Sequence, residues 1–117
     1  NAPSQSSLGL LYDNGQGVPQ DYAEAARWSR KAADQGYSPA QSNLGLMYAK
    51  GQGVPQDYVQ AHMWYNLAAS DFYGGSEQQD QEKAAKARDE VEAKMSLAQI
   101  AEAQKLARER QPTAPNP

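Results

Sequence analysis

The sequence contains no cysteine and only one histidine, His62. Without thiols the chain cannot form disulfide bonds, iron–sulfur clusters, cysteine-based zinc sites or a catalytic thiolate. A single imidazole is also too few for a histidine-rich metal centre. The composition therefore predicts a protein that works without a metal or other cofactor.

An excess of positive charge and long apolar runs are also missing. The 11 Lys and Arg residues face 14 Asp and Glu residues, so the formal net charge is -3 and the isoelectric point is near 5.0. A protein that binds nucleic acid would show a basic patch for the phosphate backbone, so we expect no nucleic-acid partner. No apolar run approaches the ~20 residues that a membrane-spanning helix needs, so we expect no membrane insertion.

The mean hydropathy of -0.87 is low enough to raise the question of disorder. However, two tryptophans, seven tyrosines and many alanines recur at regular intervals along the chain, which is not typical of disordered segments. The composition is better explained by one small helical domain with a polar surface around a thin core.

A tandem duplication organises the chain. When residues 2–37 are aligned with residues 38–73, 20 of the 36 paired positions are identical. The segment Gly-Gln-Gly-Val-Pro-Gln-Asp-Tyr stands unchanged at 15–22 and at 51–58. We therefore divide the chain into a first repeat with an incomplete start, a second repeat, a C-terminal helical pair and a tail, at 1–37, 38–73, 74–110 and 111–117.

Each repeat is predicted to form two helices. In the second copy, Ser38 is expected to cap a helix that begins at Pro39, a residue suited to the first helical turn, and ends near Lys50. Gly51 is expected to end it, because glycine tolerates the left-handed backbone conformation. Val54 precedes Pro55, which holds its backbone extended, and its side chain is expected to fill the core between the two helices.

The second helix of each repeat begins at a repeated aspartate. Asp57 is expected to cap this helix, with Gln60 as its partner in a capping box. Asp21 and Glu24 take the same places in the first copy. The two helices of a repeat are therefore expected to run antiparallel on either side of a short turn.

Apolar and small residues at helical spacing define the expected core. Glycines would let neighbouring helix backbones approach closely, and large rings would fill the space that small residues leave open. Because two helices cannot bury their own apolar stripe, the copies are expected to stack as an α-solenoid. The residues with this structural role are Leu8, Gly9, Tyr12 and Trp28 in the first copy and Leu44, Gly45, Tyr48 and Trp64 in the second.

The C-terminal region is predicted to cap the array. Capping signals at Ser76 and Ser96 predict helices over 77–95 and 97–110, and their charged outer faces are expected to be solvated. The tail at 111–117 carries three prolines and is expected to be disordered.

The N-terminal end shows no comparable cap. The chain opens Asn-Ala-Pro, without methionine or a leader, and begins inside a repeat, so we expect an excised fragment or a processed product. Either the native protein continues upstream, or the open face packs on another molecule.

The repeated motif is similar to that of a known family. The string Ala-Gln-x-x-Leu-Gly-x-x-Tyr-x-x-Gly-x-Gly-Val-Pro-Gln-Asp-x-x-x-Ala-x-x-Trp-x-x-x-Ala-Ala at 40–69 closely resembles the Sel-one-like repeat, a slightly longer relative of the tetratricopeptide repeat. Residues 95–107 also look like the closing helix of many bacterial members, so the resemblance covers roughly 2–110. The chain departs from the pattern at Ser4, where the family prefers alanine, and at Phe72, where a glycine is usual.

This resemblance implies a scaffold protein. Members of the family are adaptors, often bacterial and often exported, that hold proteins or peptides on a curved helical surface. For this chain it implies a tetratricopeptide-like superhelix, a protein or peptide partner, and a periplasmic or secreted bacterial location. Hydrolysis of cell-wall or β-lactam-type substrates has been suggested for some relatives, but the chain offers no evident pair of nucleophile and base.

The candidate chemical motifs have structural explanations. The Gly-x-Gly sequences at 15–17 and 51–53 follow a helix and precede Val-Pro, so they fit an interhelical turn better than a phosphate-binding loop. His62 replaces an alanine of the first copy, which favours a solvated or partly packed helix position. Met63 and Tyr65 do not recur and are expected to repack against the C-terminal helices, with an apolar contact patch as the alternative.

One side of the first helix in each repeat is the candidate partner-binding surface. Residues that select a partner need not match between copies, and the stripe opposite the core varies. Two leucines recur there, and they would form an apolar floor for a peptide if this side is concave; packing on the adjacent repeat is an equal alternative. The candidate binding residues are Ser7, Leu10, Asn14, Asn43, Leu46 and Lys50.

The sequence thus predicts an all-α protein, a non-enzymatic adaptor or scaffold that binds a protein or peptide on a concave helical surface. Two alternatives stay open: the hydrolase named above, and a structural module that associates with itself through the open N-terminal face.

Overall fold

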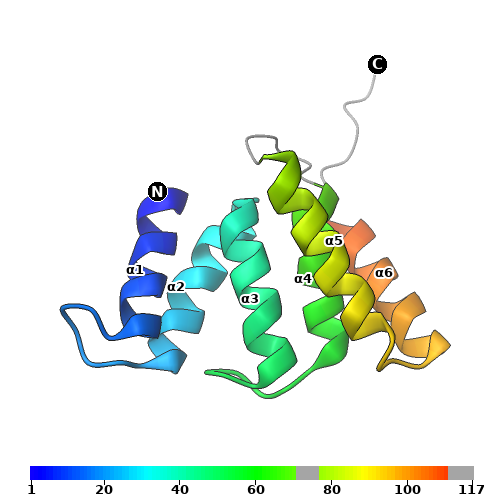
Figure 1. The fold of residues 1–117 in the computed structure, drawn as a ribbon, viewed down its shortest axis with the longest axis horizontal. Helices are drawn as coiled ribbons and strands as arrows, with labels where there is room; N and C mark the ends of the chain where they lie inside the picture. Colours follow the sequence, from blue (N-terminus) through cyan, green and yellow to red (C-terminus); the bar gives the residue numbers. More distant parts are fainter. Residues whose placement is uncertain (71–76, 111–117) are drawn as a thin grey trace.

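The computed structural model describes residues 1–70 and 77–110, and within these residues the chain forms six helices and no strand. The prediction of an all-α fold is confirmed. In chain order the helices are α1 (Ala2–Asn14), α2 (Tyr22–Asp34), α3 (Ser38–Lys50), α4 (Tyr58–Ser70), α5 (Gln78–Glu92) and α6 (Leu97–Arg110) (Figure 1).

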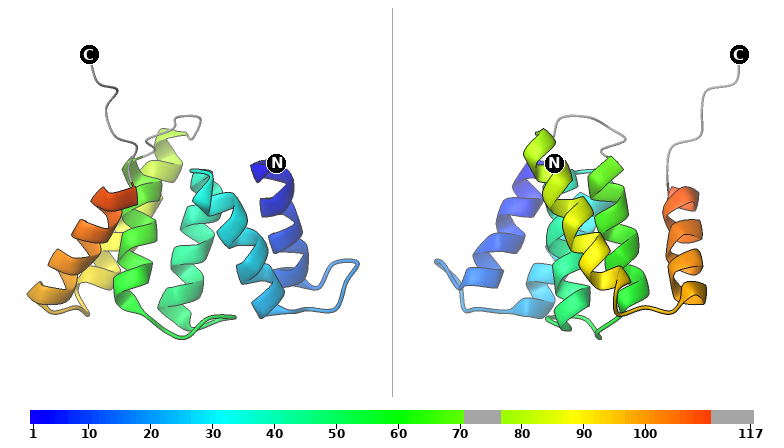
Figure 2. Two further views of the ribbon diagram at one scale, coloured as in Figure 1. Left: turned by 180° about the vertical axis from the view of Figure 1, so that it is seen from behind. Right: turned by 45° about the vertical axis from the view of Figure 1, so that its right-hand side comes forward.

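The helices form two layers. Helices α1, α3 and α5 lie in one layer, and α2, α4 and α6 lie behind them, as the front and back views show (Figure 1, Figure 2). From α1 to α5 each helix packs on the next along the chain, whereas α6 packs back on α4. This zigzag of antiparallel helices is the predicted α-solenoid.

The turn between the helices of a repeat is held by the same bonds in both copies. Gly51 ends α3 with φ 72, in the predicted left-handed conformation. The backbone N–H of Asp57 donates to the Tyr48 carbonyl at 2.9 Å, and Gln56 Nε2 donates to the Ala49 carbonyl at 3.0 Å. The corresponding groups of the first repeat make the same two bonds. The Gly-x-Gly sequences are therefore interhelical turns.

The start of α3 differs from the prediction. The helix begins at Ser38, and the residue in the cap position is Tyr37, whose backbone is extended with φ -75 and ψ 107. Tyr37 makes no side-chain capping bond, and Ser38 is buried in the first turn. The predicted Ser38 cap is wrong because the chain turns into the helix one residue earlier.

The aspartate caps are confirmed, but their capping-box partners are not. Asp57 Oδ1 accepts from the Gln60 N–H at 3.2 Å, and Asp21 Oδ1 accepts from the Glu24 N–H at 3.2 Å. The Glu24 carboxylate instead accepts a bond from Arg27 Nη2 at 3.0 Å. The aspartates therefore cap these helices without help from the third residue.

Small residues and a few large side chains form the core. Trp64, Leu44 and Met47 are almost fully buried among alanines of α2, α3 and α6, and Val54 packs against the same cluster as predicted. A Cβ added at Gly45 would lie 2.9 Å from the Tyr65 ring, which confirms the expected close approach of the helices.

The equivalent positions of the first repeat are more exposed. Leu44 and Met47 are 1% exposed, whereas Leu8 and Leu11 are 36% and 37% exposed. Trp28 is half-buried, although its counterpart in the second copy is inaccessible. Within the described residues no helix covers this side of α1 as α2 covers α3, so Leu8, which the sequence predicts to be a core residue, is exposed here.

The two C-terminal helices are close to their predicted positions. Helix α5 ends at Glu92, three residues before the predicted end, and buries Ala84 and Val91. Tyr65 is buried in a cluster with Val91, in agreement with the expected repacking against this region. The predicted cap at Ser76 and the tail at 111–117 lie outside the described residues.

Helix α6 has its predicted bounds and its predicted cap. The Ser96 N–H donates to Gln99 Oε1 at 2.9 Å, and the Gln99 N–H donates to Ser96 Oγ at 3.1 Å. At the other end, Arg110 Nη1 pairs with Asp34 Oδ1 of α2 at 3.1 Å, and its guanidinium lies 4.6 Å from the centre of the Trp64 ring. The last helix thus reaches back to the first repeat.

Candidate binding surface

The recurring leucines of the predicted surface are exposed in both repeats. Leu10 on α1 is 46% exposed and Leu46 on α3 is 40% exposed. Ser7, Asn14 and Lys50, which flank them, are exposed as well. Of the two interpretations that the sequence left open, this exposure favours a surface role for the leucines over packing on the adjacent repeat.

Asn43 has a different role from its neighbours on this stripe. Its side chain is half-buried, and Nδ2 donates to Ser29 Oγ of α2 at 3.1 Å. The equivalent Ser7 donates its hydroxyl to the Pro3 carbonyl in its own helix at 3.0 Å. Asn43 therefore helps to hold α3 on α2 rather than facing a partner.

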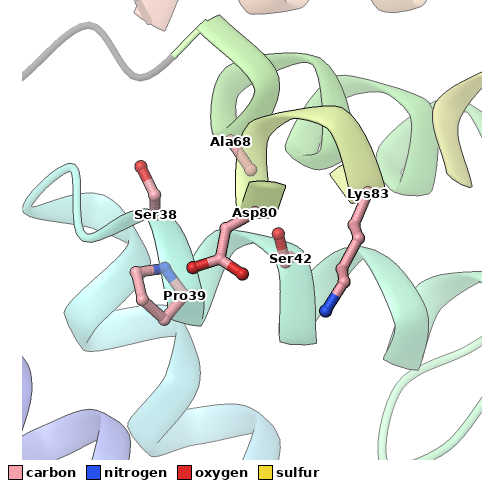
Figure 3. Close-up of a pocket in the computed structure, with 6 residues that line it drawn as sticks. All are labelled: Ser38, Pro39, Ser42, Ala68, Asp80 and Lys83. Atoms are coloured by element: carbon pink, nitrogen blue, oxygen red, sulfur yellow. The ribbon is translucent and has the colours of Figure 1, made fainter. Parts of the chain in front are cut away.

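A pocket of about 210 Å³ lies between the first turns of α3 and the start of α5 (Figure 3). Its floor comes from the first turns of α3, its far wall from the start of α5, and one side from the end of α4. The sequence analysis placed no site here, because the pocket is created by contacts between elements that are distant in sequence. The lining residues are Ser38, Pro39, Ser42, Ala68, Asp80 and Lys83.

Two opposite charges line this pocket. The Asp80 carboxylate faces the first turn of α3, where the helix dipole favours a negative charge, and Lys83 extends along α3 beside Ser42 (Figure 3). Neither Asp80 nor Lys83 has an ion-pair partner within residues 1–70 and 77–110. The pocket therefore offers one acidic and one basic group to an incoming polar ligand.

His62 is more deeply buried than the solvated or partly packed position that the sequence favoured. Its side chain is 1% exposed between α4 and the C-terminal helices. Burial lowers the pKa of the imidazole below its usual 6.5, and the Glu92 carboxylate opposes this shift without cancelling it. The sequence of the first repeat held a usable signal, because the equivalent position is an apolar alanine, Ala26, which is also buried.

The described residues offer neither a cluster of metal ligands nor a membrane-spanning helix. Within residues 1–70 and 77–110, no three His, Asp or Glu side chains are grouped so that they could hold a metal ion. Of the six described helices, none has the length and apolar character needed to cross a membrane.

Two solved structures share this arrangement of helices. One is c5321, a protective antigen of uropathogenic Escherichia coli with an SLR fold; it is 35% identical, with a TM-score of 0.83, and the match covers 94% of this chain and 22% of that chain. The other is a Sel1 repeat protein from Oxalobacter formigenes; it is 32% identical, with a TM-score of 0.69, over 94% of this chain and 44% of that chain. The chain thus spans less than half the length of either.

The sequence comparison agrees with the structural one. No curated protein matches the chain. A model of the Sel1 repeat family, however, matches residues 2–37 and 38–71, which together make up more than half of the sequence. With two repeats matched and both solved structures built in the same way, the chain belongs to the Sel1 repeat family, whose members are generally scaffolds for protein interactions.

Proposed function

We propose that this chain is a non-enzymatic adaptor that binds a peptide segment of a partner protein across the face formed by α1, α3 and α5. The observation that carries the proposal is the exposure of Leu10 and Leu46 at the same place in both repeats. The Sel1 repeat family is typically non-enzymatic, which is consistent with this role.

The chemistry of the surface indicates the kind of peptide that fits. Each exposed leucine offers an apolar anchor, and full burial of such a side chain contributes about 1.5–3 kcal/mol. Lys50 lies one helical turn after Leu46, and Lys83 of α5 lines the pocket between α3 and α5. A peptide that carries apolar side chains next to an acidic residue would contact both the exposed leucines and the lysines.

Peptide selection followed by titration tests the proposal. Peptides selected on the immobilised 117-residue chain are titrated against the wild type and against Leu46→Arg and Lys50→Glu. We expect each substitution to weaken binding by about 10-fold or more, because one removes an anchor and the other reverses a charge.

Matched controls lie on α6, in the other layer. Leu97 is 86% exposed and Lys105 is also exposed, so Leu97→Arg and Lys105→Glu introduce the same chemical changes away from the proposed site. Unchanged affinity in these controls, with circular dichroism confirming that all variants are folded, supports the proposal. Equal losses in the test and control variants, or no loss in either, would contradict it.

A second candidate function is self-association through the N-terminal end. Leu8 and Leu11 are exposed on α1 although the equivalent Leu44 and Met47 are buried against a neighbouring helix pair. A second copy that covers this apolar face would bury the two leucines. Light scattering over a range of concentrations should then show a dimer that Leu8→Lys and Leu11→Lys dissociate, and a monomer at every concentration would exclude this function.

A further inference from the structure

Helix α1 stands at one edge of the array, and one side of it repeats a surface that α3 buries (Figure 1). Leu8 and Leu11 take the places of Leu44 and Met47, which belong to the buried core. Helix α3 packs on α2 of the preceding repeat, whereas no described helix covers the corresponding side of α1. The exposed leucines therefore belong to an interface that is complete in the second repeat and open in the first.

The polar bonds of this interface show the same difference. Gln41 of α3 is buried, and its Nε2 donates to the Ala33 carbonyl of α2 at 3.2 Å. Gln5 takes the place of Gln41 on α1, but its Oε1 accepts a bond from Gln35 Nε2 within the first repeat. The bond that holds α3 on a preceding helix thus has no counterpart at α1 among the described residues.

The turn after α1 is open where the turn after α3 is in contact. A Cβ added at Gly53 would meet the backbone of Tyr22, in the first turn of α2, whereas a Cβ added at Gly17 would meet nothing within 4 Å. The two glycines have the same sequence neighbours and the same φ of 78. The open turn and the exposed leucines therefore lack the same neighbour, a helix placed as α2 is placed against the second repeat.

We propose that this N-terminal face, formed by Leu8, Leu11 and Gly17, docks a further helix pair of the same type. The second helix of that pair lies against α1, and its first turn lies against Gly17. Its contact side is uncharged and small, because α2 offers the buried Ser29 and the Ala33 carbonyl to α3 in the equivalent interface. Such a helix would bury both leucines as α2 helps to bury the residues at their places in the second repeat.

The charge of the available surfaces favours this occupant over a second copy of the chain. In a second copy the α2 surface is already covered by its own α3. The C-terminal end of a second copy offers α5, which carries five acidic and three basic side chains and buries only Ala84 and Val91. Packing these charges on the leucines would remove them from water without partners, which is costly.

Thiol labelling provides the test, because the chain contains no cysteine of its own. A copy of residues 2–37 placed directly ahead of Ala2 keeps the register of the repeats and supplies the helix pair at high effective concentration. Leu8→Cys is made in this extended chain and in the 117-residue chain. We expect the extension to slow its reaction with a thiol reagent by at least about 10-fold, because the docked helix covers the side chain.

Leu10→Cys on the same helix is the matched control. Its counterpart Leu46 stays exposed although α2 covers α3, so the extension should leave the labelling rate of Leu10→Cys unchanged. Circular dichroism should show the added pair folding, since a two-helix repeat is stable only when it is stacked.

Three outcomes would overturn the proposal. The first is an unchanged labelling rate of Leu8→Cys in the extended chain, and the second is an added pair that contributes no helix. The third is protection of Leu8→Cys in the 117-residue chain as its concentration rises, which would assign the face to a second copy.

Discussion

At the scale of single residues, the two tryptophans make the sharpest contrast between the repeats. Trp64 is inaccessible, and Arg30 and Arg110 each lie within 5.5 Å of its ring centre. Trp28 is half-buried, and its nearest cations, Arg27 and Lys31, come from its own helix. The same residue type therefore contributes differently to stability in the two copies.

Truncation of each tryptophan measures this difference. We expect Trp64→Ala to lower the free energy of unfolding by about 3–5 kcal/mol, the usual loss for a buried large aromatic side chain. Trp28→Ala should cost clearly less, because part of its ring already contacts solvent. Urea unfolding of the two variants gives both values, and equal losses would show that the first repeat is as well packed as the second.

The buried histidine predicts a pH dependence of stability. Burial lowers the pKa of His62 below 6.5 in the folded chain, so below pH 6.5 the unfolded chain binds a proton that the folded chain excludes. The contribution of His62 to stability is therefore complete above pH 6.5 and declines as the pH falls through 6.5 towards the folded pKa. Glu92 and Asp89 of α5 oppose this shift, whereas Arg88 reinforces it.

Replacement of the imidazole tests this prediction. In His62→Phe the titrating group is absent, so its stability should fall less between pH 7.5 and about 5.5 than that of the wild type. Urea unfolding at several pH values measures the difference between the two proteins. A difference that stays constant over this range would show that His62 keeps its ordinary pKa in the folded chain.

The sequence predicted the interior of the second repeat better than that of the first. Leu44 and Trp64 are buried as predicted, but Leu8 is exposed, since no described helix covers its side of α1. The burial of a side chain depends on its neighbours, and identical residues in the two repeats do not have identical neighbours. The alignment of the two repeats could still have predicted that His62 is buried, because the small, apolar Ala26 occupies the equivalent position in the first repeat.

At the scale of the helices, local rules accounted for most boundaries. The end of α3 follows from a glycine and the start of α6 from a capping box, and both signals depend on residues close in sequence. The pocket between α3 and α5 was not predicted. It depends on how far apart helices from different parts of the chain lie, and the periodicity of one helix carries no such information.

The cap of α6 yields a prediction at this scale. Ser96→Ala removes the hydroxyl that accepts from the Gln99 N–H, and we expect a loss of about 1 kcal/mol in the free energy of unfolding. Ser96→Asp should recover most of this loss, because aspartate also caps helices well. Chemical denaturation measures both changes, and a loss in Ser96→Ala that aspartate does not recover would point to a role other than capping.

At the scale of the whole molecule, contacts between repeats join the units into one body. Helix α3 packs on α2, and Arg110 of the last helix pairs with Asp34 of the first repeat. The turn of the second repeat also lies against the first, since a Cβ added at Gly53 would be 2.1 Å from the Tyr22 carbonyl oxygen. The stacked repeats, rather than either helix pair alone, form the proposed peptide-binding face.

A matched pair of glycine substitutions tests this stacking most directly. Gly17 and Gly53 both have φ 78, but a Cβ at Gly17 would meet nothing within 4 Å. Gly17→Ala should therefore cost only the backbone strain of about 1–2 kcal/mol, whereas Gly53→Ala should cost about 1–3 kcal/mol more because it pushes against α2. A larger loss of unfolding free energy in Gly53→Ala is the predicted result, and equal losses in the two variants would contradict the stacking of the repeats.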